Sequence, residues 1–409
     1  MPRRRSTGRT FDGEDDFDEH LARRLAARER RDLRRGLTPA DRVGERARFA
    51  TDRGSDPPSF GPTELVFASN DYLGLAGDER VRRAAAAAAR DVGTGAGASR
   101  LVTGDTAVHR ALERDLADAK GTARALVFSS GYAANVGTIA ALSPAAVFSD
   151  ELNHASIVDG CRLSGAETVV YDHADPDDLD RKLRERGADG PRLVVTDSVF
   201  SVDGDVAPLA DLCDVAEAHG AWLMVDEAHA TGLYDDAGGI VQRDGLGERV
   251  HVQLGTLSKA LAAQGGFVAG SEPLVEHLLN AARSFVFSTG LAPPAAGAAR
   301  EALRIARENA RRERLWENAA RLRNGLADAG YDVRGETQIL PVVVGDRRDA
   351  LALAEAVRDR GVVAPSIRPP TVPEGTSRVR VAPTAAHAAT DVDRCLDAFR
   401  DAGREVGLL

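Results

Sequence analysis

Lysine and cysteine are scarce in this sequence. Only three of its 53 basic residues are lysines, and only three cysteines occur among 409 residues. The cysteines, at positions 161, 213 and 395, are widely separated and form no C-x-x-C pair. This usage is typical of small buried thiols in a reducing compartment.

Segments that would direct the chain into a membrane or out of the cell are also missing. No run of about 18 apolar residues occurs, so we expect no transmembrane helix. The basic residues 3–5 are followed by acidic residues rather than by an apolar stretch, so we expect no secretory signal. The sequence therefore predicts a soluble cytoplasmic protein.

Basic charge is in the minority. The chain has 53 Lys+Arg against 63 Asp+Glu, a formal net charge of −10, which argues against nucleic-acid binding because that needs a basic face. Residues 226–229 spell D-E-A-H, but no G-x-x-x-x-G-K-[ST] accompanies them, so a helicase is not expected. The nine histidines show no metal-ligand spacing, so we predict no metal site.

Short apolar runs alternate with helical segments between residues 105 and 270. This pattern predicts an α/β fold with a mostly parallel, doubly wound sheet. Breaks at 54–62 and 292–294 divide the chain into an N-terminal arm or helix (1–60), a large domain (61–294) and a smaller α+β domain (295–409). Residues 1 to about 16 are expected to be disordered. The runs expected to form the large sheet are 125–128, 145–148, 168–171, 193–196, 222–225 and 250–254.

Chemically active residues follow several of these strands. Ligands in doubly wound sheets bind outside the carboxyl ends of the strands, and the segments 129–132, 201–203, 226–229 and 256–259 fall there. Lys259 is the one lysine in a glycine-rich setting after a buried strand, where burial lowers the pKa of an amine and makes it a nucleophile. An ordinary surface lysine in a loop is the alternative interpretation.

The other candidates have equally plain alternatives. Asp226 could hold a protonated ring nitrogen with His229 beside it, or it could cap a turn. The segment 129–135 could bind a phosphate at a helix N-terminus, or it could be an ordinary strand–helix turn. His154 could stack on an aromatic cofactor or could start a helix. Arg380 could grip a carboxylate or could form a surface ion pair.

Taken in this order, the motifs resemble those of pyridoxal-phosphate enzymes of fold type I, and more closely the α-oxoamine synthase family. The resemblance extends from about residue 20 to the C-terminus. It implies a fold type I transferase that binds pyridoxal 5'-phosphate and forms a homodimer with shared active sites. The matching segments are S-N-D-Y-L-G-L (69–75), G-A-G-A-S-R (95–100), N-H-A-S (153–156), D-E-A-H-A-T-G (226–232) and G-T-L-S-K (255–259).

The resemblance also implies a role for each matching residue. Lys259 joins to the cofactor's aldehyde and moves protons at the substrate Cα, and Asp226 and His154 complete the catalytic set. Asp226 keeps the cofactor's ring nitrogen protonated. The implied cofactor-binding set is Gly131, Tyr132, His154, Ser201, Asp226, His229, Thr256, Lys259 and, from a second subunit, Thr289. The implied substrate-binding set is Arg34, Asn70, Thr371 and Arg380.

The implied reaction is the decarboxylating condensation of L-alanine with pimeloyl-CoA, or with a pimeloyl carrier protein, in biotin biosynthesis. The segments I-R-P-P-T-V-P (367–373) and R-V-R (378–380) look most like family members with that activity. The D-E-A-H segment is shared with relatives that use glycine, so glycine C-acetyltransferase (2-amino-3-ketobutyrate CoA ligase) is the alternative. A catalytically silent family member would lack the lysine, and the presence of Lys259 argues against that interpretation.

Overall fold

A computed structural model describes residues 17–31, 33–187 and 189–409. The chain forms two compact units, one of residues up to 41 with 48–61, the other of 42–47 with 62–409. The disorder predicted for residues 1 to about 16 lies outside the described residues. In the first unit, helix α1 (Phe17–Glu29) buries none of its side chains, and Asp41 accepts hydrogen bonds from the backbone and side chain of Arg48.

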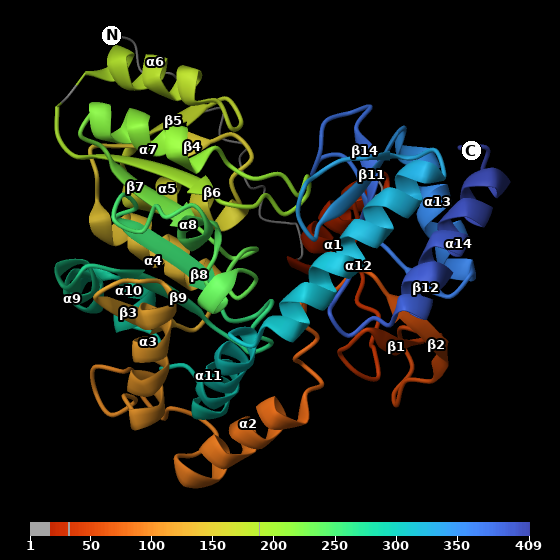
Figure 1. Cartoon of the computed structure of the whole chain (residues 1–409), viewed down its shortest axis with the longest axis horizontal. Helices are drawn as coiled ribbons and strands as arrows, with labels where there is room; N and C mark the ends of the chain where they lie inside the picture. Colours follow the sequence, from red (N-terminus) through yellow and green to blue (C-terminus); the bar gives the residue numbers. More distant parts are fainter. Residues whose placement is uncertain (1–16, 32, 188) are drawn as a thin grey trace. The chain divides into compact units, whose positions relative to one another are not determined.

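The second unit contains a seven-stranded sheet with the strand order β3-β9-β8-β7-β6-β4-β5 (Figure 1). The four neighbouring pairs from β8 to β5 are parallel, whereas β9 runs antiparallel to both β3 and β8. The predicted α/β fold with a mostly parallel sheet is therefore confirmed. The strands are β3 (Arg124–Phe128), β4 (Ala146–Asp150), β5 (Glu167–Tyr171), β6 (Arg192–Asp197), β7 (Trp222–Asp226), β8 (Val252–Thr256) and β9 (Gly266–Gly270).

The sequence does not predict strand β9, because glycine, which is depleted in strands, stands at both of its ends. The first of these glycines is required by its neighbour. A Cβ atom on Gly266 would lie 2.5 Å from the backbone nitrogen of Gly131, so only glycine lets the strand pass the start of helix α4 this closely.

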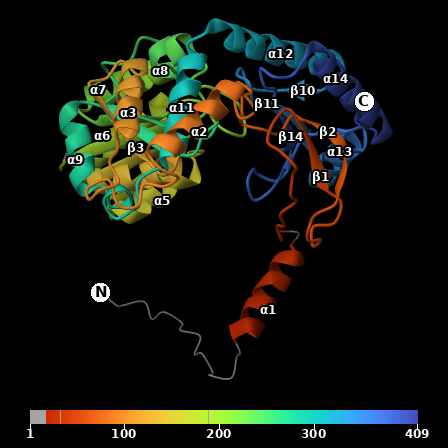
Figure 2. The same ribbon diagram turned by 90° about the horizontal axis from the view of Figure 1, so that it is seen from below.

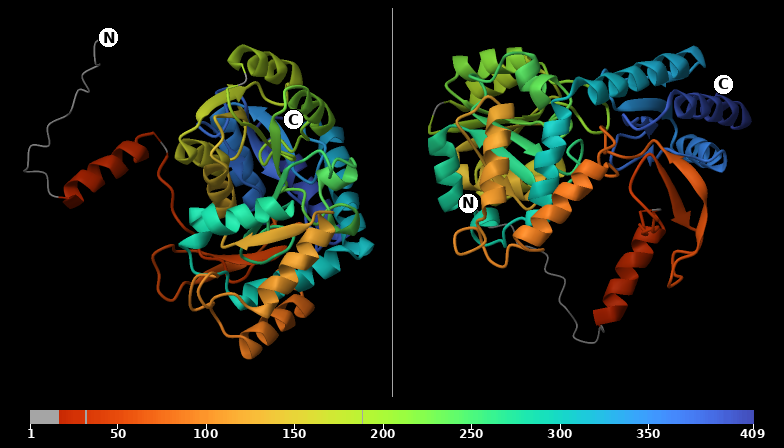
Figure 3. Two further views of the ribbon diagram at one scale, coloured as in Figure 1. Left: turned by 90° about the vertical axis from the view of Figure 1, so that its left-hand side faces the viewer. Right: turned by 60° about the horizontal axis from the view of Figure 1, so that its bottom comes forward.

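Helices cover the sheet, and the central strands β4, β8 and β9 are buried along their whole length. Pro293 and Pro294 are not a break between elements but the first two residues of α11, where a missing N–H costs nothing. Helix α11 packs along the alanine-rich α2 (Figure 3). The helices are α2 (Glu79–Asp91), α3 (Ala107–Ala119), α4 (Gly131–Leu142), α5 (Ala155–Ser164), α6 (Pro176–Arg186), α7 (Leu209–Ala218), α8 (Ile240–Arg243), α9 (Glu272–Ala281), α10 (Arg283–Val286) and α11 (Pro293–Ala306).

A second sheet, with the order β10-β11-β14-β13, forms a separate core with the C-terminal helices. Its neighbouring strands are antiparallel, and α12 lies alongside α14 (Figure 2). The elements are β10 (Asp332–Val333), β11 (Leu340–Gly345), β13 (Ser366–Ile367), β14 (Ser377–Val381), α12 (Asn309–Asp328), α13 (Arg347–Asp359) and α14 (Ala389–Glu405). Outside this sheet, β12 (Val362–Val363) pairs in parallel with the end of β2 (Phe60–Val66).

This arrangement is the smaller α+β part that the sequence predicted. The division of the chain at 60/61 and 294/295 stays a prediction. Within the described residues, no helix has both the length and the apolar composition that crossing a bilayer requires.

Lys120, at the C-terminus of α3, forms a buried ion pair with Glu227, the residue that follows β7. Both side chains are inaccessible to solvent, and Lys120 Nζ lies 2.5 Å from Glu227 Oε2. The other carboxylate oxygen accepts the backbone N–H of Val241 at 2.9 Å. The pair joins α3 and α8 to the end of β7, next to the last strand residue, Asp226.

Replacing Lys120 with methionine would leave the Glu227 carboxylate buried without its counter-charge. We expect Lys120→Met to lower the free energy of unfolding, measured by urea denaturation, by about 3–5 kcal/mol. Lys182→Met is the matched control, because Lys182 is partly exposed and its partner Asp178 keeps a second cation, Arg181. We expect its loss to be smaller, about 1 kcal/mol. Equal losses of unfolding free energy in the two variants would show that the buried Lys120–Glu227 ion pair does not stabilise the fold as we expect.

Candidate active site

The predicted site residues gather at the carboxyl edge of the large sheet. Asp226 is the last residue of β7 and Thr256 the last of β8, with Lys259 three residues beyond it. Strands β8, β7, β6 and β4 are successive neighbours, so the segments that carry Ser201 and His154, after β6 and β4, leave the same edge. This is the edge at which doubly wound sheets bind ligands.

Lys259 carries a partly buried amine whose affinity for a proton is lowered. Its Nζ lies 2.8 Å from His229 Nε2. Burial lowers the pKa of Lys259 to about 8, although the carboxylates of Asp226 and Asp197 oppose the shift. An amine with this pKa is partly uncharged near neutral pH and can act as a nucleophile or a base.

Asp226 is held by donors on both of its carboxylate oxygens. Its Oδ1 accepts the backbone N–H of Ala228 at 2.8 Å, and its Oδ2 accepts Nδ2 of Asn135 at 2.7 Å. The side chain is only 3% exposed. Hydrogen bonds of this kind stabilise the ionised carboxylate, so Asp226 can present a fixed negative charge to a cation at the sheet edge.

His154 starts helix α5 and has an exposed ring. Its backbone N–H donates to Asp197 Oδ2 at 2.9 Å, and the backbone N–H of Asp197 donates to Asn153 Oδ1 at 3.0 Å. This reciprocal pair ties the start of α5 to the end of β6. Burial and the nearby Asp226 carboxylate raise the pKa of Asp197 well above its usual range.

His229 connects Lys259 to a second group of polar residues. Its Nδ1 lies 2.7 Å from the hydroxyl of Tyr72. Arg380 donates from Nη2 to that hydroxyl at 3.3 Å and to Asn70 Oδ1 at 3.0 Å. Burial, and then the charges of Lys259 and Arg380, lower the pKa of His229 well below its usual range. The ring is therefore neutral at physiological pH.

One hydrogen-bond donor of Arg380 is unused. Its Nε is buried and has no hydrogen-bond partner within the described chain. A buried guanidinium with an unused donor fits a carboxylate ligand, which accepts two parallel N–H bonds. The structure thus connects Arg380 and Asn70 to Lys259 through Tyr72 and His229.

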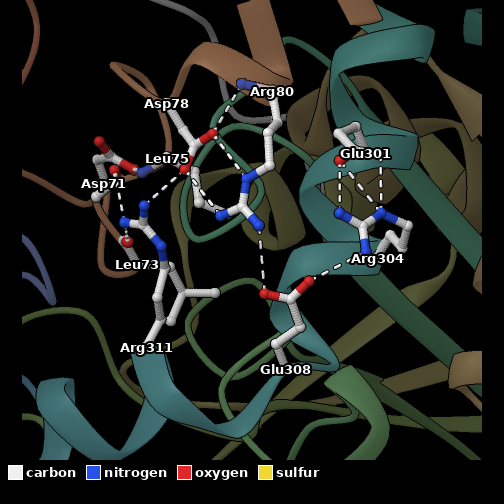
Figure 4. A network of polar contacts seen from close by, with 10 residues as sticks. Asp71, Leu73, Leu75, Asp78, Arg80, Glu301, Arg304, Glu308 and Arg311 are labelled. Atoms are coloured by element: carbon white, nitrogen blue, oxygen red, sulfur yellow. Dashed lines mark hydrogen bonds and ion pairs between the residues drawn. The ribbon is translucent and has the colours of Figure 1, made fainter.

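Charged side chains fix the turn that carries Asn70 and Tyr72, through contacts of Asp71 and of the Leu73 carbonyl (Figure 4). Asp71 accepts the backbone N–H groups of Leu75 and Ala76 at 2.8 and 3.1 Å. On its other side, Arg311 of α12 donates to the carbonyl of Leu73 at 2.8 Å. The turn is thereby attached to α12, whose C-terminal half packs in the second core.

The N-terminus of α4 is shaped to receive an anion. Ser130 caps the helix by accepting the N–H of Ala133 at 3.0 Å, which leaves the amides of Gly131 and Tyr132 for another acceptor. A Cβ atom on Gly131 would stand 3.4 Å from the Thr256 side chain. Three predicted residues thus meet at one helix end, beside the strand that leads to Lys259.

Three further predicted residues have other contacts. Arg34 belongs to the first compact unit, and within it pairs with Glu29 at 2.8 Å. Thr289 is exposed and forms an isolated bridge with Ser99. Thr371 is exposed in a turn in which its N–H donates to Arg368 at 3.0 Å. In the described chain, neither threonine bonds to another predicted site residue.

The structure adds polar residues that the sequence did not single out. Asn135 and Tyr72 lie inside quoted motifs, but a motif does not tell which of its members touches Asp226 or His229. Asp197 ends β6 as Asp226 ends β7, and the two face each other in the strand register. That shared position at strand ends is the signal by which Asp197 could have been found.

Comparison with protein families shows one matching model, aminotransferase class I and II, over residues 62–399. The chain is 46% identical over 366 residues to 8-amino-7-oxononanoate synthase of Lysinibacillus sphaericus, covering 88% of this chain and 94% of that one. It is 52% identical over 354 residues to the 8-amino-7-oxononanoate synthase of Anaeromyxobacter dehalogenans, covering 84% and 89%.

Solved structures give a consistent result. A high-resolution structure of SPT that contains pyridoxal phosphate as an internal aldimine matches with a TM-score of 0.89 and 32% identity, covering 97% of this chain and 100% of that one. Serine palmitoyltransferase of Sphingomonas wittichii matches with a TM-score of 0.88 and 32% identity, covering 96% and 98%. The 8-amino-7-oxononanoate synthase of Francisella tularensis, with a TM-score of 0.70 and 23% identity over 84% and 98%, shares the fold.

The lowered pKa of Lys259 predicts a selective reaction with amine reagents. Trinitrobenzenesulfonate attacks only uncharged amines, so labelling of Lys259 in cofactor-free protein should be half-maximal near pH 8 and should fall as the pH drops and the ammonium form returns. Peptide mapping by mass spectrometry would measure it. Lys120 is the internal control, because its side chain is 0% exposed and should stay unlabelled. Labelling of Lys259 only above about pH 10, the range of an ordinary lysine, would count against the buried amine.

Proposed function

Because the chain belongs to the aminotransferase class I and II family, we propose that it is a pyridoxal-phosphate-dependent 8-amino-7-oxononanoate synthase. It condenses L-alanine with pimeloyl-CoA, or with a pimeloyl carrier protein, and releases CoA and CO₂ in the synthesis of biotin. The observation that carries the proposal is the Lys259 amine, 2.8 Å from His229 at the sheet edge that Asp226 occupies. The substrate assignment is supported by relatives of that name at 46% and 52% identity.

Residues at the sheet edge fit pyridoxal phosphate part by part. The amides of Gly131 and Tyr132, with Thr256, would hold the phosphate at the start of α4, where the helix dipole favours an anion. Asp226 would face the ring nitrogen, and His229 and Ser201 the phenolic oxygen. His154, whose ring is exposed, would lie against the face of the ring.

When bound, pyridoxal phosphate supplies an aldehyde for attachment to an amine and a cationic ring that accepts electrons from the substrate Cα. Asp226 keeps the proton on the ring nitrogen, because its carboxylate is fixed by donors on both oxygens. The carboxylate of Asp226 thus sustains the positive charge that draws those electrons into the ring.

Lys259 takes the proton from the substrate Cα, and it returns a proton to the same carbon after the new carbon–carbon bond has formed and the carboxylate has left as CO₂. Its pKa of about 8 suits both steps, because a group that titrates near the working pH can accept and give a proton. Arg380 and Asn70 hold the amino-acid carboxylate, with the unused Nε of Arg380 as an additional donor. The resemblance further assigns Arg34 and Thr371 to substrate binding.

Glycine C-acetyltransferase is the alternative, because the D-E-A-H and N-H-A-S segments are shared with enzymes that use glycine. Serine palmitoyltransferase is a further candidate in view of the structural neighbours. These candidates differ in amino acid and acyl chain but use the same lysine and aspartate, so only a substrate comparison separates them.

Measuring CoA release with three substrate pairs makes this comparison. We expect CoA release to be fastest with L-alanine plus pimeloyl-CoA, and slower with glycine plus acetyl-CoA or with L-serine plus palmitoyl-CoA. Lys259→Ala should lose at least about 100-fold of the rate, the contribution typical of a general acid–base group. Faster release with either rival pair would overturn the substrate assignment while leaving the reaction class intact.

The same proposal includes a homodimer in which Thr289 of one subunit reaches the phosphate held by the other. Its exposed position in this chain is compatible with such a role. We expect sedimentation equilibrium to give a mass near twice 43.3 kDa. Thr289→Ala should weaken pyridoxal phosphate binding without changing that mass, whereas a monomer with full activity would refute the shared site. A cytoplasmic location is part of the same proposal.

A further inference from the structure

Asn135 of α4 connects two of the residues assigned to the cofactor. Its side chain is 1% exposed. The amide nitrogen donates to Asp226 Oδ2 at 2.7 Å and to Ser156 Oγ at 2.9 Å, which uses both N–H bonds of the NH₂ group. Its Oδ1 is buried and has no hydrogen-bond partner in the described chain. The residue is therefore oriented by its two donor contacts.

Ser156 extends the connection to His154. The hydroxyl oxygen of Ser156 lies 2.7 Å from His154 Nδ1, and its backbone N–H donates to the same nitrogen at 3.2 Å. A backbone N–H can only donate, so Nδ1 must be the unprotonated nitrogen. The hydroxyl accepts from Asn135 and has its own proton to give to Nδ1. The neutral imidazole of His154 thus carries its proton on Nε2.

The position of Asn135 on α4 explains how one helix can serve several parts of the ligand. Asn135 comes four residues after Gly131 and three after Tyr132, so all three lie on one face of the helix. The first turn offers backbone amides to an anion, and the next turn offers a side-chain amide to Asp226. A rigid helix therefore sets the spacing between the phosphate end and the ring-nitrogen end of the site.

We propose that Asn135 is a positioning residue that holds the Asp226 carboxylate and the His154 imidazole in fixed relation, with Ser156 as the second link. The inference rests on the proposed function, in which Asp226 lies at the ring nitrogen and His154 on the ring face. Asparagine suits the role because it brings two donors without charge. An apolar residue of similar size would leave Asp226 Oδ2 and Ser156 Oγ without this donor.

The two links have different consequences, and this makes the proposal testable. Asn135→Leu removes both links, whereas Ser156→Ala removes only the link to His154. Two quantities separate them: the dissociation constant of pyridoxal phosphate, titrated into cofactor-free protein by its visible absorbance, and the exchange of the alanine Cα proton in deuterated water, followed by NMR without an acyl donor.

We expect Asn135→Leu to weaken cofactor binding by about 10- to 100-fold, the range for a hydrogen bond to a charged group, and to slow proton exchange. Ser156→Ala should keep the dissociation constant within about threefold of the wild-type value, because Asp226 retains its donor, and should slow exchange by about tenfold. If Asn135→Leu does not fold, Asn135→Thr is the substitute. Its hydroxyl has one donor and can serve only one link, so either the dissociation constant must rise or the proton exchange must slow.

Asn318→Leu is the matched control. Asn318 is also a buried asparagine, and its Nδ2 donates to the carbonyls of Thr384 and His387 at 3.0 Å each. It should lose comparable stability in urea yet bind the cofactor and exchange protons as the wild type does. The proposal is wrong if Asn135→Leu binds the cofactor as tightly as the wild type, or if Ser156→Ala loses as much affinity as Asn135→Leu. A wild-type protein that takes up no pyridoxal phosphate would instead refute the proposed function itself.

Discussion

The chemistry of the sheet edge depends on the electrostatic balance around one partly buried amine, that of Lys259. Lys259 lies next to a neutral histidine and near two carboxylates, and its burial outweighs their attraction and lowers the pKa of the amine to about 8. Were the amine fully exposed, it would hold its proton too tightly to react near neutral pH. Were Asp226 loosely held, water would screen its charge. Both conditions require a rigid and partly buried sheet edge, and the rest of the fold supplies it.

That rigidity comes from contacts that lie outside the reacting groups. The Lys120–Glu227 pair fixes the segment after β7, and Gly266 lets β9 pass close to the start of α4. Arg311 fixes the turn of Asn70 and Tyr72 to α12, so the second core also helps to define the site. Each of these contacts joins elements that are far apart in sequence, so the site is a property of the whole second unit.

The sequence was sufficient for the elements with strong local signals. The apolar runs before Asp226 and Lys259 predicted strands β7 and β8, and their order predicted the sheet edge at which these residues meet. Strand β9 escaped prediction because it begins and ends with glycine, and the first of these, Gly266, is required by the nearby Gly131 rather than by strand propensity. Likewise, the contact between Asn135 and Asp226 joins residues 91 positions apart, and no local pattern encodes such a distance. The homodimer and the residue roles remain proposals.

Reduction of the protein with borohydride in the presence of pyridoxal phosphate, followed by peptide mapping, shows which amine holds the cofactor. We expect the cofactor's mass to become permanently attached to Lys259, and Asp226→Ala to weaken the attachment. Attachment to the partly exposed Lys182 in place of Lys259, or a protein that binds no cofactor at all, would contradict this expectation.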